Sequence, residues 1–416
     1  MYATHLVCKG CGAEHPLDAR FACDRCFGPL EAAYDVEAIA AAVSRESVAE
    51  GPATLWRWAA FLPVDTPARG LPVGNSPLLP APRLAEELGL RCELFVKTET
   101  SNPTHSFKDR VVAVAAAKAV DLGFEALACA STGNLAGATA AVGAALGLPT
   151  YIFVPDDLER EKIISAAAYG ATVFEVSGTY DDVNRLCSEL AYDRPWAFVN
   201  VNMRPYYAEG SKTIALETVE SLGWRVPDRV VAPIASGSLY TKILRGFDEA
   251  RAAGLADDGP PPAMHGAQGA GCAPVADAYA AGADDVIPVR PTGIAKSLAI
   301  GAPADGVYAL DVARRTGGSI ESVDDDEIVE GIRLLARTTG IFTETAGGVT
   351  TAVLRKLAER GEIGDGERVV VYITGDGLKT IDAVEPTVTT VAVPPDPDAV
   401  DAALERGELR AGTGGW

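Results

Sequence analysis

Residues 101–110 have the sequence SNPTHSFKDR, and Lys108 in this stretch stands where a loop gives way to a helix. Small and polar residues with a proline precede the lysine. The alanine-rich, apolar run that follows it, VVAVAAAKAV (111–120), is typical of a packed helix. Ser106 and Asp109 are candidate capping groups for that helix. At such a junction the backbone of a lysine is held in place while its amine can still reach a cavity. An ordinary lysine in the first turn of a helix, with no functional role, has the same local sequence.

Around this stretch, short apolar segments of strand character alternate with longer helical segments. The expected strands cover residues 92–99, 126–132, 149–155, 171–178, 197–201, 229–236, 263–268 and 368–375. The expected helices cover residues 110–123, 134–147, 162–170, 180–193, 238–254 and 323–340, with a further alanine-rich helical stretch at 35–50. Apolar strands that alternate with helices predict parallel sheets covered on both faces. The fold class is therefore α/β with two open parallel-sheet domains, and residues 269–322, rich in Gly, Ala and Pro, are expected to be looser.

The N-terminal segment CKGCGAEHPLDARFACDRC (8–26) contains half of the eight cysteines in the chain. It has two CxxC pairs separated by eleven residues, a spacing that brings four thiolates to one tetrahedral point. The predicted ligands of a closed, structural zinc site are Cys8, Cys11, Cys23 and Cys26. Four free cysteines grouped by chance are the alternative. The scattered Cys92, Cys129, Cys187 and Cys272 are expected to be small buried residues.

Composition excludes several classes of partner. The 416 residues carry a formal net charge of -21 with a pI near 4.6, so the surface repels nucleic acid and anionic lipid. An apolar fraction of 48% indicates a large core. No apolar run is long enough to cross a bilayer, and the start MYATHLVCKGCG lacks the features of a signal peptide. These properties predict a cytoplasmic protein that acts on small molecules.

Three strand-to-helix loops have a composition suited to binding anions. They are ASTGNLAG (130–137), PIASGSLYTK (233–242) and YITGDGLKT (372–380). In open parallel sheets, ligands bind beyond the carboxyl ends of the strands, where such loops lead into helices. Small residues and backbone N–H groups at a helix start suit a phosphate or a carboxylate. Each loop alone is equally compatible with a structural turn, but with Lys108 they predict a site with one amine and two anion-binding nests.

An amine that forms a Schiff base, a phosphate nest and a carboxylate nest are the parts that pyridoxal phosphate enzymes need. The motifs SFKDR (106–110), STGNLAG (131–137), the Gly/Ser turn (235–239), FTETAGG (342–348) and TGDGLK (374–379) occur in this order. This arrangement resembles the fold-type II pyridoxal phosphate enzymes of the tryptophan synthase beta-like superfamily, and most closely the threonine synthase family. The resemblance runs from about residue 73 to residue 390, and an N-terminal zinc ribbon also occurs in that broader group.

The resemblance implies roles for individual residues. Lys108 would form the Schiff base and then serve as a mobile base, and Asn134 would hydrogen-bond the 3'-oxygen of the cofactor. Thr374 would face the pyridine nitrogen. The implied substrate-carboxylate residues are Ser131, Thr132 and Gly133, and the implied cofactor-phosphate turn is Ala235, Ser236, Gly237, Ser238 and Leu239. That turn departs from the GNxGN-like turn of many threonine synthases and from the four-glycine turn of many dehydratases, but Ser236 and Ser238 can donate hydroxyls in place of glycine or asparagine.

Other polar residues near these motifs have two interpretations each. Glu344 lines the cofactor cavity or caps the helix that follows it. His105 relays a proton or is a hydrogen-bonded loop residue, and Asp376 brings an acid near the cofactor ring. The candidates for a substrate phosphate are Lys296 and Ser297, with Lys212 and Lys242 less favoured; for each of these a solvated or structural role is equally compatible with the sequence.

The function implied by the resemblance is a threonine synthase, which converts O-phosphohomoserine and water into threonine and phosphate, acting as a homodimer. Two alternatives stay open: a threonine or serine dehydratase or cysteate synthase of the same fold, and a non-catalytic zinc-ribbon binding protein. The expected domains are a zinc ribbon (1–32), a large cofactor-binding domain (33–105 and 226–393), a small α/β domain (106–225) and a C-terminal tail (394–416), with residues 410–416 expected to be mobile.

Overall fold

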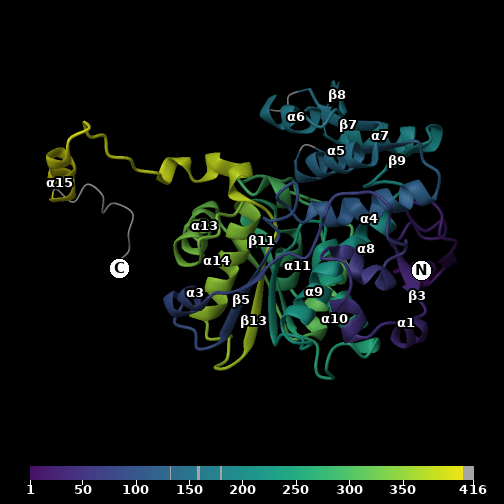
Figure 1. Cartoon of the computed structure of the whole chain (residues 1–416), viewed down its shortest axis with the longest axis horizontal. Helices are drawn as coiled ribbons and strands as arrows, with labels where there is room; N and C mark the ends of the chain where they lie inside the picture. The colour runs from purple at the N-terminus through teal and green to yellow at the C-terminus, as the bar shows by residue number, and fades with distance from the viewer. Residues whose placement is uncertain (132, 157–159, 179, 406–416) are drawn as a thin grey trace.

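The structure is a computed structural model that describes residues 1–131, 133–156, 160–178 and 180–405. Its named strands form three sheets. Figure 1 shows the elements of a small sheet lying above a larger one, with an N-terminal sheet beside them. The expected fold class, α/β with two sheets rich in parallel strands and a small N-terminal unit, is confirmed.

The large sheet has six strands, and five of them are parallel. β4 is antiparallel to β5 and forms one edge. In spatial order the strands are β12 (Ile320–Val323), β11 (Ala263–Gly269), β10 (Arg229–Pro233), β13 (Arg368–Ile373), β5 (Glu93–Thr98) and β4 (Leu78–Pro80). Val230 and Val370 belong to the core on one face, and Val231 and Val371 belong to the core on the other. Because neighbouring residues of a strand point to opposite faces, this sheet is buried on both sides.

Helices cover both faces of the large sheet. The core on one face includes residues of α9 (Thr213–Ser221), α10 (Ser238–Ala252), α11 (Pro274–Ala280) and α12 (Gly306–Arg315). The core on the other face includes residues of α3 (Pro82–Glu87), α13 (Asp325–Thr339) and α14 (Thr345–Glu359). Residues 269–322, expected to be looser, contain η2 (Ala270–Cys272), α11, η3 (Lys296–Leu298) and α12. Five of these helices did not follow from the sequence pattern: α3, α9, α11, α12 and α14.

The small sheet has four parallel strands. In spatial order these are β8 (Thr172–Val176), β7 (Thr150–Pro155), β6 (Ala126–Ala130) and β9 (Trp196–Phe198). The helices of this part of the chain are α4 (Lys108–Asp121), α5 (Asn134–Leu146), α6 (Arg160–Ala167), α7 (Tyr180–Asp193) and α8 (Arg204–Gly210). Leu127 and Cys129 pack into the core on one face, while Ala128 and Ala130 pack into the core on the other. β6, in the interior of this sheet, is therefore buried on both faces as its apolar sequence predicted, whereas the edge strand β8 is largely exposed.

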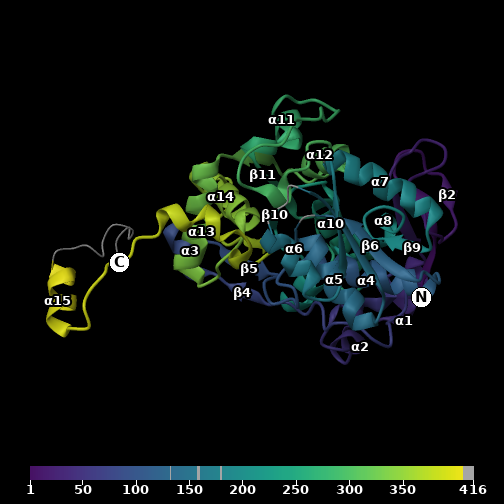
Figure 2. The ribbon, with the colours of Figure 1, turned by 90° about the horizontal axis from the view of Figure 1, so that it is seen from above.

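The N-terminal sheet consists of β1 (Ala3–Cys8), β2 (Glu14–His15) and β3 (Leu30–Tyr34), all antiparallel. The alanine-rich stretch 35–50 forms two helices, α1 (Val36–Ala42) and α2 (Arg45–Ala49), because Ser44 caps a new helix. A 3-10 helix, η1 (Leu55–Phe61), leads towards the large sheet. In Figure 2 the N-terminal sheet lies at the edge of the molecule opposite the C-terminal segment.

The C-terminal segment leaves the body of the molecule (Figures 1 and 2). It comprises η4 (Gly377–Ala383), η5 (Glu385–Thr387) and α15 (Pro397–Glu405). The expected mobile residues 410–416 lie outside the described residues. Among the residues that are described, no helix combines the length and the apolar character that a membrane span requires.

A buried cluster of charges joins the two larger sheets. The Arg110 guanidinium of α4 donates from Nη1 to Glu217 Oε1 of α9 at 2.6 Å and from Nε to Glu99 Oε2 at 2.5 Å. Lys97 of β5 donates to Glu217 Oε2 at 2.8 Å. Burial alone would raise the pKa of Glu217, but the charges of Arg110 and Lys97 hold that pKa well below its usual range. The cluster therefore keeps the Glu217 carboxylate ionised in the interior.

We expect Arg110→Ala to lower the free energy of unfolding by about 3–5 kcal/mol, because it leaves two buried carboxylates without their partner. Denaturant unfolding followed by circular dichroism measures this loss. Arg337→Ala is the control: Arg337 pairs with Glu87 and Glu330 on the surface, so its loss is expected to stay below about 1 kcal/mol. Equal losses in the two variants would contradict a special role for the buried cluster.

Candidate active site

Lys108 begins α4 directly after the loop that follows β5. Its backbone N–H donates to Ser106 Oγ at 3.2 Å, but the N-cap residue is Phe107, and the helix has no side-chain capping bond. The expectation that Asp109 caps the helix is wrong. Its carboxylate instead accepts from the backbone N–H and the hydroxyl of Thr104, each at 2.7 Å, and so closes the loop before the helix. These local bonds hold the position from which the Lys108 side chain starts.

The Lys108 amine is half-buried and faces aromatic groups. Nζ donates to the Tyr207 hydroxyl at 2.9 Å and lies 4.5 Å from the centre of the Phe107 ring. Tyr207 belongs to α8, which packs against α4. The sequence pattern did not single out Tyr207, because 99 residues separate it from Lys108 and no motif marks it.

Thr374 lies beside the Lys108 segment. β13 pairs with β5, so the residues after both strands meet at the same edge of the large sheet. The Phe107 N–H donates to the Thr374 carbonyl oxygen at 2.9 Å, and Thr374 is 3% exposed. Asp376 uses its carboxylate to accept from the Leu378 N–H at 2.9 Å. The acid expected near a cofactor ring is thus engaged in capping η4.

Asn134 and Glu344 connect the two larger sheets at this edge. Asn134 is the first residue of α5, and its Nδ2 donates to Glu344 Oε2 at 2.9 Å. Glu344 precedes α14 but makes no side-chain capping bond there. Burial raises the pKa of Glu344, opposed by the Asn134 hydrogen bond and by the charges of Lys379 and Lys108. Of the two interpretations of Glu344, the geometry matches a side chain that lines the site.

The turn at residues 235–239 follows β10 and leads into α10. Gly237 has a φ of +91°, which favours glycine, and a Cβ there would lie 2.8 Å from the Asp305 carbonyl oxygen. The Ser238 hydroxyl is buried and has no hydrogen-bond partner among the described residues. A free hydroxyl and free N–H groups at the start of a 15-residue helix form a nest suited to an anion.

The candidate substrate-binding residues fall in two places. Gly133 precedes the first residue of α5 and its N–H donates to Ser131 Oγ at 3.4 Å, while Thr132 lies outside the described residues. Ser297 is exposed in η3, which packs on α14. Ser131 and Gly133 are therefore next to Asn134, whereas Ser297 belongs to a separate element.

The less favoured basic candidates have structural partners. Lys242 Nζ pairs with Glu31 at 2.9 Å and also with Glu209. Lys212 Nζ pairs with Glu209 at 2.7 Å, and both lysines are buried. His105 is an exposed loop residue whose Nδ1 lies 3.0 Å from the Thr100 carbonyl oxygen. The ion pairs of the lysines and the hydrogen bond of His105 match the structural interpretation of each residue.

The four N-terminal cysteines converge as their spacing predicted. The sulfur atoms of Cys8, Cys11, Cys23 and Cys26 all lie within 4.8 Å of one another. Gly28 and Arg25 direct their backbone N–H groups at the sulfurs of Cys26 and Cys23. Four thiols at these distances form a donor set suited to tetrahedral zinc, with no position left for a substrate.

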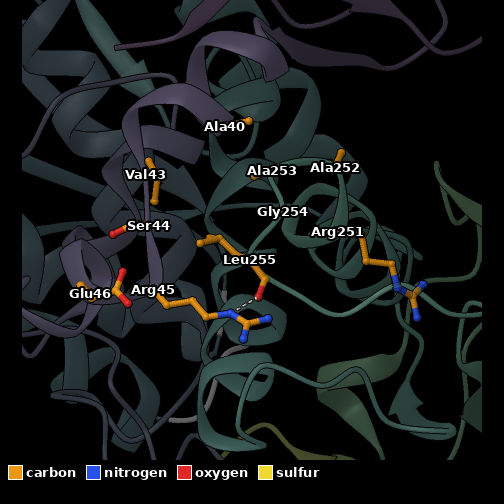
Figure 3. Close-up of a pocket in the computed structure, with 10 residues that line it drawn as sticks. All are labelled: Ala40, Val43, Ser44, Arg45, Glu46, Arg251, Ala252, Ala253, Gly254 and Leu255. Atoms are coloured by element: carbon orange, nitrogen blue, oxygen red, sulfur yellow. Dashed lines mark hydrogen bonds between the residues drawn. The ribbon is translucent and has the colours of Figure 1, made fainter.

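A pocket elsewhere on the molecule is remote from Lys108. Figure 3 shows it between α1, α2 and the end of α10, where Arg45 Nε donates to the Leu255 carbonyl oxygen at 2.8 Å. The nest at Ser238 is at the other end of α10, about 20 Å away for a helix of that length. This pocket therefore does not belong to the candidate active site.

Comparisons with known proteins agree with this geometry. Residues 70–375 match the family described as pyridoxal-phosphate dependent enzyme. The chain is 39% identical to the threonine synthase of Methanocaldococcus jannaschii over 90% of this chain and 93% of that protein. It is 37% identical to the threonine synthase of Methanosarcina acetivorans over 96% of this chain and 97% of that protein.

Solved structures share the fold at low sequence identity. Maize serine racemase superimposes with a TM-score of 0.62 at 17% identity, covering 89% of this chain and 99% of that chain. An L-serine ammonia-lyase from Rhizomucor miehei gives a TM-score of 0.64 at 22% identity, covering 75% of this chain and 96% of that chain. The fold, the order of the motifs and the similarity over nearly the whole length together establish that this chain belongs to the threonine synthases of the pyridoxal-phosphate dependent enzyme family.

Proposed function

We propose that the protein converts O-phosphohomoserine and water into L-threonine and inorganic phosphate with pyridoxal 5'-phosphate as cofactor. The observation that carries this proposal is the 39% identity to a threonine synthase over 90% of the chain. In this reaction the bond from Cγ to the phosphate oxygen breaks, Cγ ends as a methyl group, and water supplies the hydroxyl at Cβ. Atoms balance without a further reactant.

The residues at the carboxyl edge fit the cofactor. Lys108 would hold it through its amine, and the turn Ala235 to Leu239 would hold its phosphate. The buried, unpartnered Ser238 hydroxyl and the close approach that only Gly237 permits support this assignment. Asn134 would hydrogen-bond the 3'-oxygen of the cofactor. Thr374, whose carbonyl oxygen accepts from the Phe107 N–H, would face the pyridine nitrogen.

When bound, pyridoxal phosphate withdraws electrons from the bonds at Cα of an attached amino acid. The Lys108 amine would remove the proton from Cα and return one at the end of the reaction. Tyr207 accepts a hydrogen bond from that amine and would orient it. Thr374 offers a hydroxyl where other enzymes of this cofactor carry a carboxylate, so proton transfers depend on the positioning of Lys108.

The substrate presents two anionic groups to the site. Ser131, Thr132 and Gly133 at the start of α5 would bind its carboxylate, because free N–H groups at a helix N-terminus favour an anion. The departing phosphate is a dianion and needs a second anion site. Ser297 and Lys296 in η3 are the candidates, both on the solvent-exposed side of that turn.

We also propose a homodimer that acts in the cytoplasm on small molecules, with one structural zinc ion per chain. The net charge of -21 supports the absence of nucleic-acid and anionic membrane partners. The proposed domain limits remain 1–32, 33–105 with 226–393, 106–225 and 394–416.

We expect threonine and phosphate in equal amounts when the purified protein is incubated with phosphohomoserine and pyridoxal phosphate, and little phosphate release from phosphoserine. Colorimetric phosphate detection with amino-acid chromatography measures both products. Formation of 2-oxobutyrate from threonine or pyruvate from serine, without phosphohomoserine turnover, would instead identify a dehydratase. Preferential turnover of phosphoserine would favour a cysteate synthase.

Lys108→Ala should abolish covalent attachment of the cofactor after borohydride reduction, because the amine that holds it is gone. Mass spectrometry of the reduced protein measures the attachment, and circular dichroism checks the fold. Lys118→Gln is the matched control on the same helix, ten residues or about 15 Å further along. A Lys108 variant that still carries the reduced cofactor would overturn the assignment.

Gly237→Ala should weaken pyridoxal phosphate binding by about tenfold or more, a loss of about 1.4 kcal/mol, because its methyl group displaces the backbone of Asp305. Gly254→Ala is the control at the other end of α10: its φ is also positive, +71°, but a methyl group there meets nothing within 4 Å. We expect that control to lose about 1 kcal/mol of stability with unchanged cofactor affinity. Fluorescence titration compares the two, and equal affinities would rule out the turn as the phosphate site.

Protein purified without chelator should contain one zinc ion per chain, and Cys8→Ser or Cys26→Ser should lose it. Elemental analysis by plasma mass spectrometry gives the metal content. Cys92→Ser, which lies outside the cluster, is the control and should keep the metal. Metal-free wild-type protein would show that the cluster is a group of free thiols.

A further inference from the structure

One lysine joins the cysteine cluster to the body of the molecule. Lys9 lies between Cys8 and Cys11, and its Nζ donates to Asp305 Oδ1 at 2.9 Å. The two side chains are only 14% and 8% exposed. Lys9 Nζ also lies 4.0 Å from the centre of the Tyr308 ring on α12. The knuckle formed by the first cysteine pair is therefore anchored by a partly buried charge.

Asp305 in turn contacts the proposed phosphate turn. Its backbone N–H donates to the Ser236 carbonyl oxygen at 2.8 Å, and its own carbonyl group limits the space at Gly237. The second carboxylate oxygen of Asp305 accepts from Arg204 Nη2 at 3.2 Å. Lys9 and Arg204 thus fix both carboxylate oxygens of the residue that shapes the turn.

A second contact runs from the N-terminal sheet to the helix behind the turn. Glu31 of β3 pairs with Lys242 at 2.9 Å and with Arg245 at 3.0 Å, both on α10. Burial alone would raise the pKa of Glu31, but the two cations lower it to about 2, so the carboxylate stays charged. Lys242 is one helical turn after Ser238. The same N-terminal unit therefore holds the turn through Asp305 and its helix through Glu31.

We infer that the cysteine ribbon is a clamp on the phosphate turn, with Lys9 as its positioning residue. Metal binding by the four cysteines and phosphate-group binding by residues 235–239 then favour one another. The inference rests on the proposed cofactor site.

The proposed coupling depends on how mobile the short segment from Cys8 to Cys11 is with and without the metal. Coordination through Cys8 and Cys11 fixes the backbone on both sides of Lys9, and loss of the metal frees it. The Lys9 amine is then no longer held against Asp305, so the turn at residues 235–239 is less ordered. Binding of the anion then has to order the turn. A ligand that meets an ordered site has less conformational entropy to lose. Because coupling between two sites is reciprocal, the anion must tighten metal binding by the same factor.

The test measures equilibrium binding in the cofactor-free full chain. Pyridoxal phosphate and, separately, inorganic phosphate are titrated by fluorescence into zinc-loaded protein and into protein stripped by a chelator. We expect both probes to bind about fivefold or more weakly after stripping. Zinc affinity, from competition with a chromogenic chelator, should rise by the same factor when either probe is present.

Variants separate the clamp from general damage to the ribbon. Lys9→Gln should retain zinc but lose the coupling, and Lys9→Arg should restore it. Arg20→Gln is the matched control, because Arg20 pairs only with Asp18 and Asp24 among the acidic residues described and both belong to the ribbon. It should bind zinc and both probes as the wild type does.

The outcomes are distinguishable. Failure of the zinc-loaded protein to bind pyridoxal phosphate at all would overturn the proposed function. Tight binding with the same affinity in zinc-loaded and stripped protein would overturn the clamp alone. A zinc effect on pyridoxal phosphate without one on inorganic phosphate, or full coupling in Lys9→Gln, would also overturn it, since the link would not run through Lys9 and the turn.

Discussion

A fully buried arginine is the constraint on which the arrangement of the two larger sheets depends. The charged Arg110 guanidinium on α4 can be buried because Glu99 and Glu217 pair with it. Glu99 follows β5 of the large sheet, whereas Glu217 belongs to α9. Separating these elements would leave uncompensated charges in a medium of low dielectric constant. The cluster therefore specifies how α4, and with it Lys108, sits against the large sheet.

With α4 fixed in this way, groups from separate loops meet at one edge. Lys108 lies after β5, Thr374 directly follows β13, and the turn at Gly237 follows β10. These three strands are neighbours in the large sheet. Asn134 comes from the small sheet and reaches the same edge through its hydrogen bond to Glu344. Because the central strands of both sheets are buried on both faces, a ligand has room beyond their ends. The location of the site is a consequence of the layered architecture.

The N-terminal ribbon is integrated into this arrangement. Its Lys9 pairs with Asp305 and its Glu31 with Lys242, both next to the proposed phosphate turn. Tyr34 donates a hydrogen bond at 2.8 Å to Glu209, which also pairs with Lys242. A module that served only to stabilise its own fold would not need partly buried ion pairs across its boundary. The charges at this boundary make the ribbon part of the scaffold that shapes the proposed cofactor site.

The sequence by itself determined the features that depend on neighbouring residues. Strand and helix alternation, the loop-to-helix junction at Lys108 and the four-cysteine cluster all follow from periodicity or spacing within a few residues. The order of the motifs was enough to predict the family. Helices α9 and α14 were not predicted because they are mostly buried, and a buried helix lacks the polar face that makes its period visible. Helix α12 was not predicted because it lies in residues 269–322, whose Gly and Pro content resembles that of a loop.

Only the tertiary structure decided which polar groups are partners. Arg110 and Glu217 are 107 residues apart, and Lys9 and Asp305 are 296 residues apart. Nothing in the sequence near either member marks such a pair. The same holds for Tyr207 beside Lys108, which are 99 residues apart. A buried charge takes whichever partner the packed chain brings within hydrogen-bonding distance, and that choice depends on long-range packing because the cost of leaving the charge unpaired arises only once water is excluded.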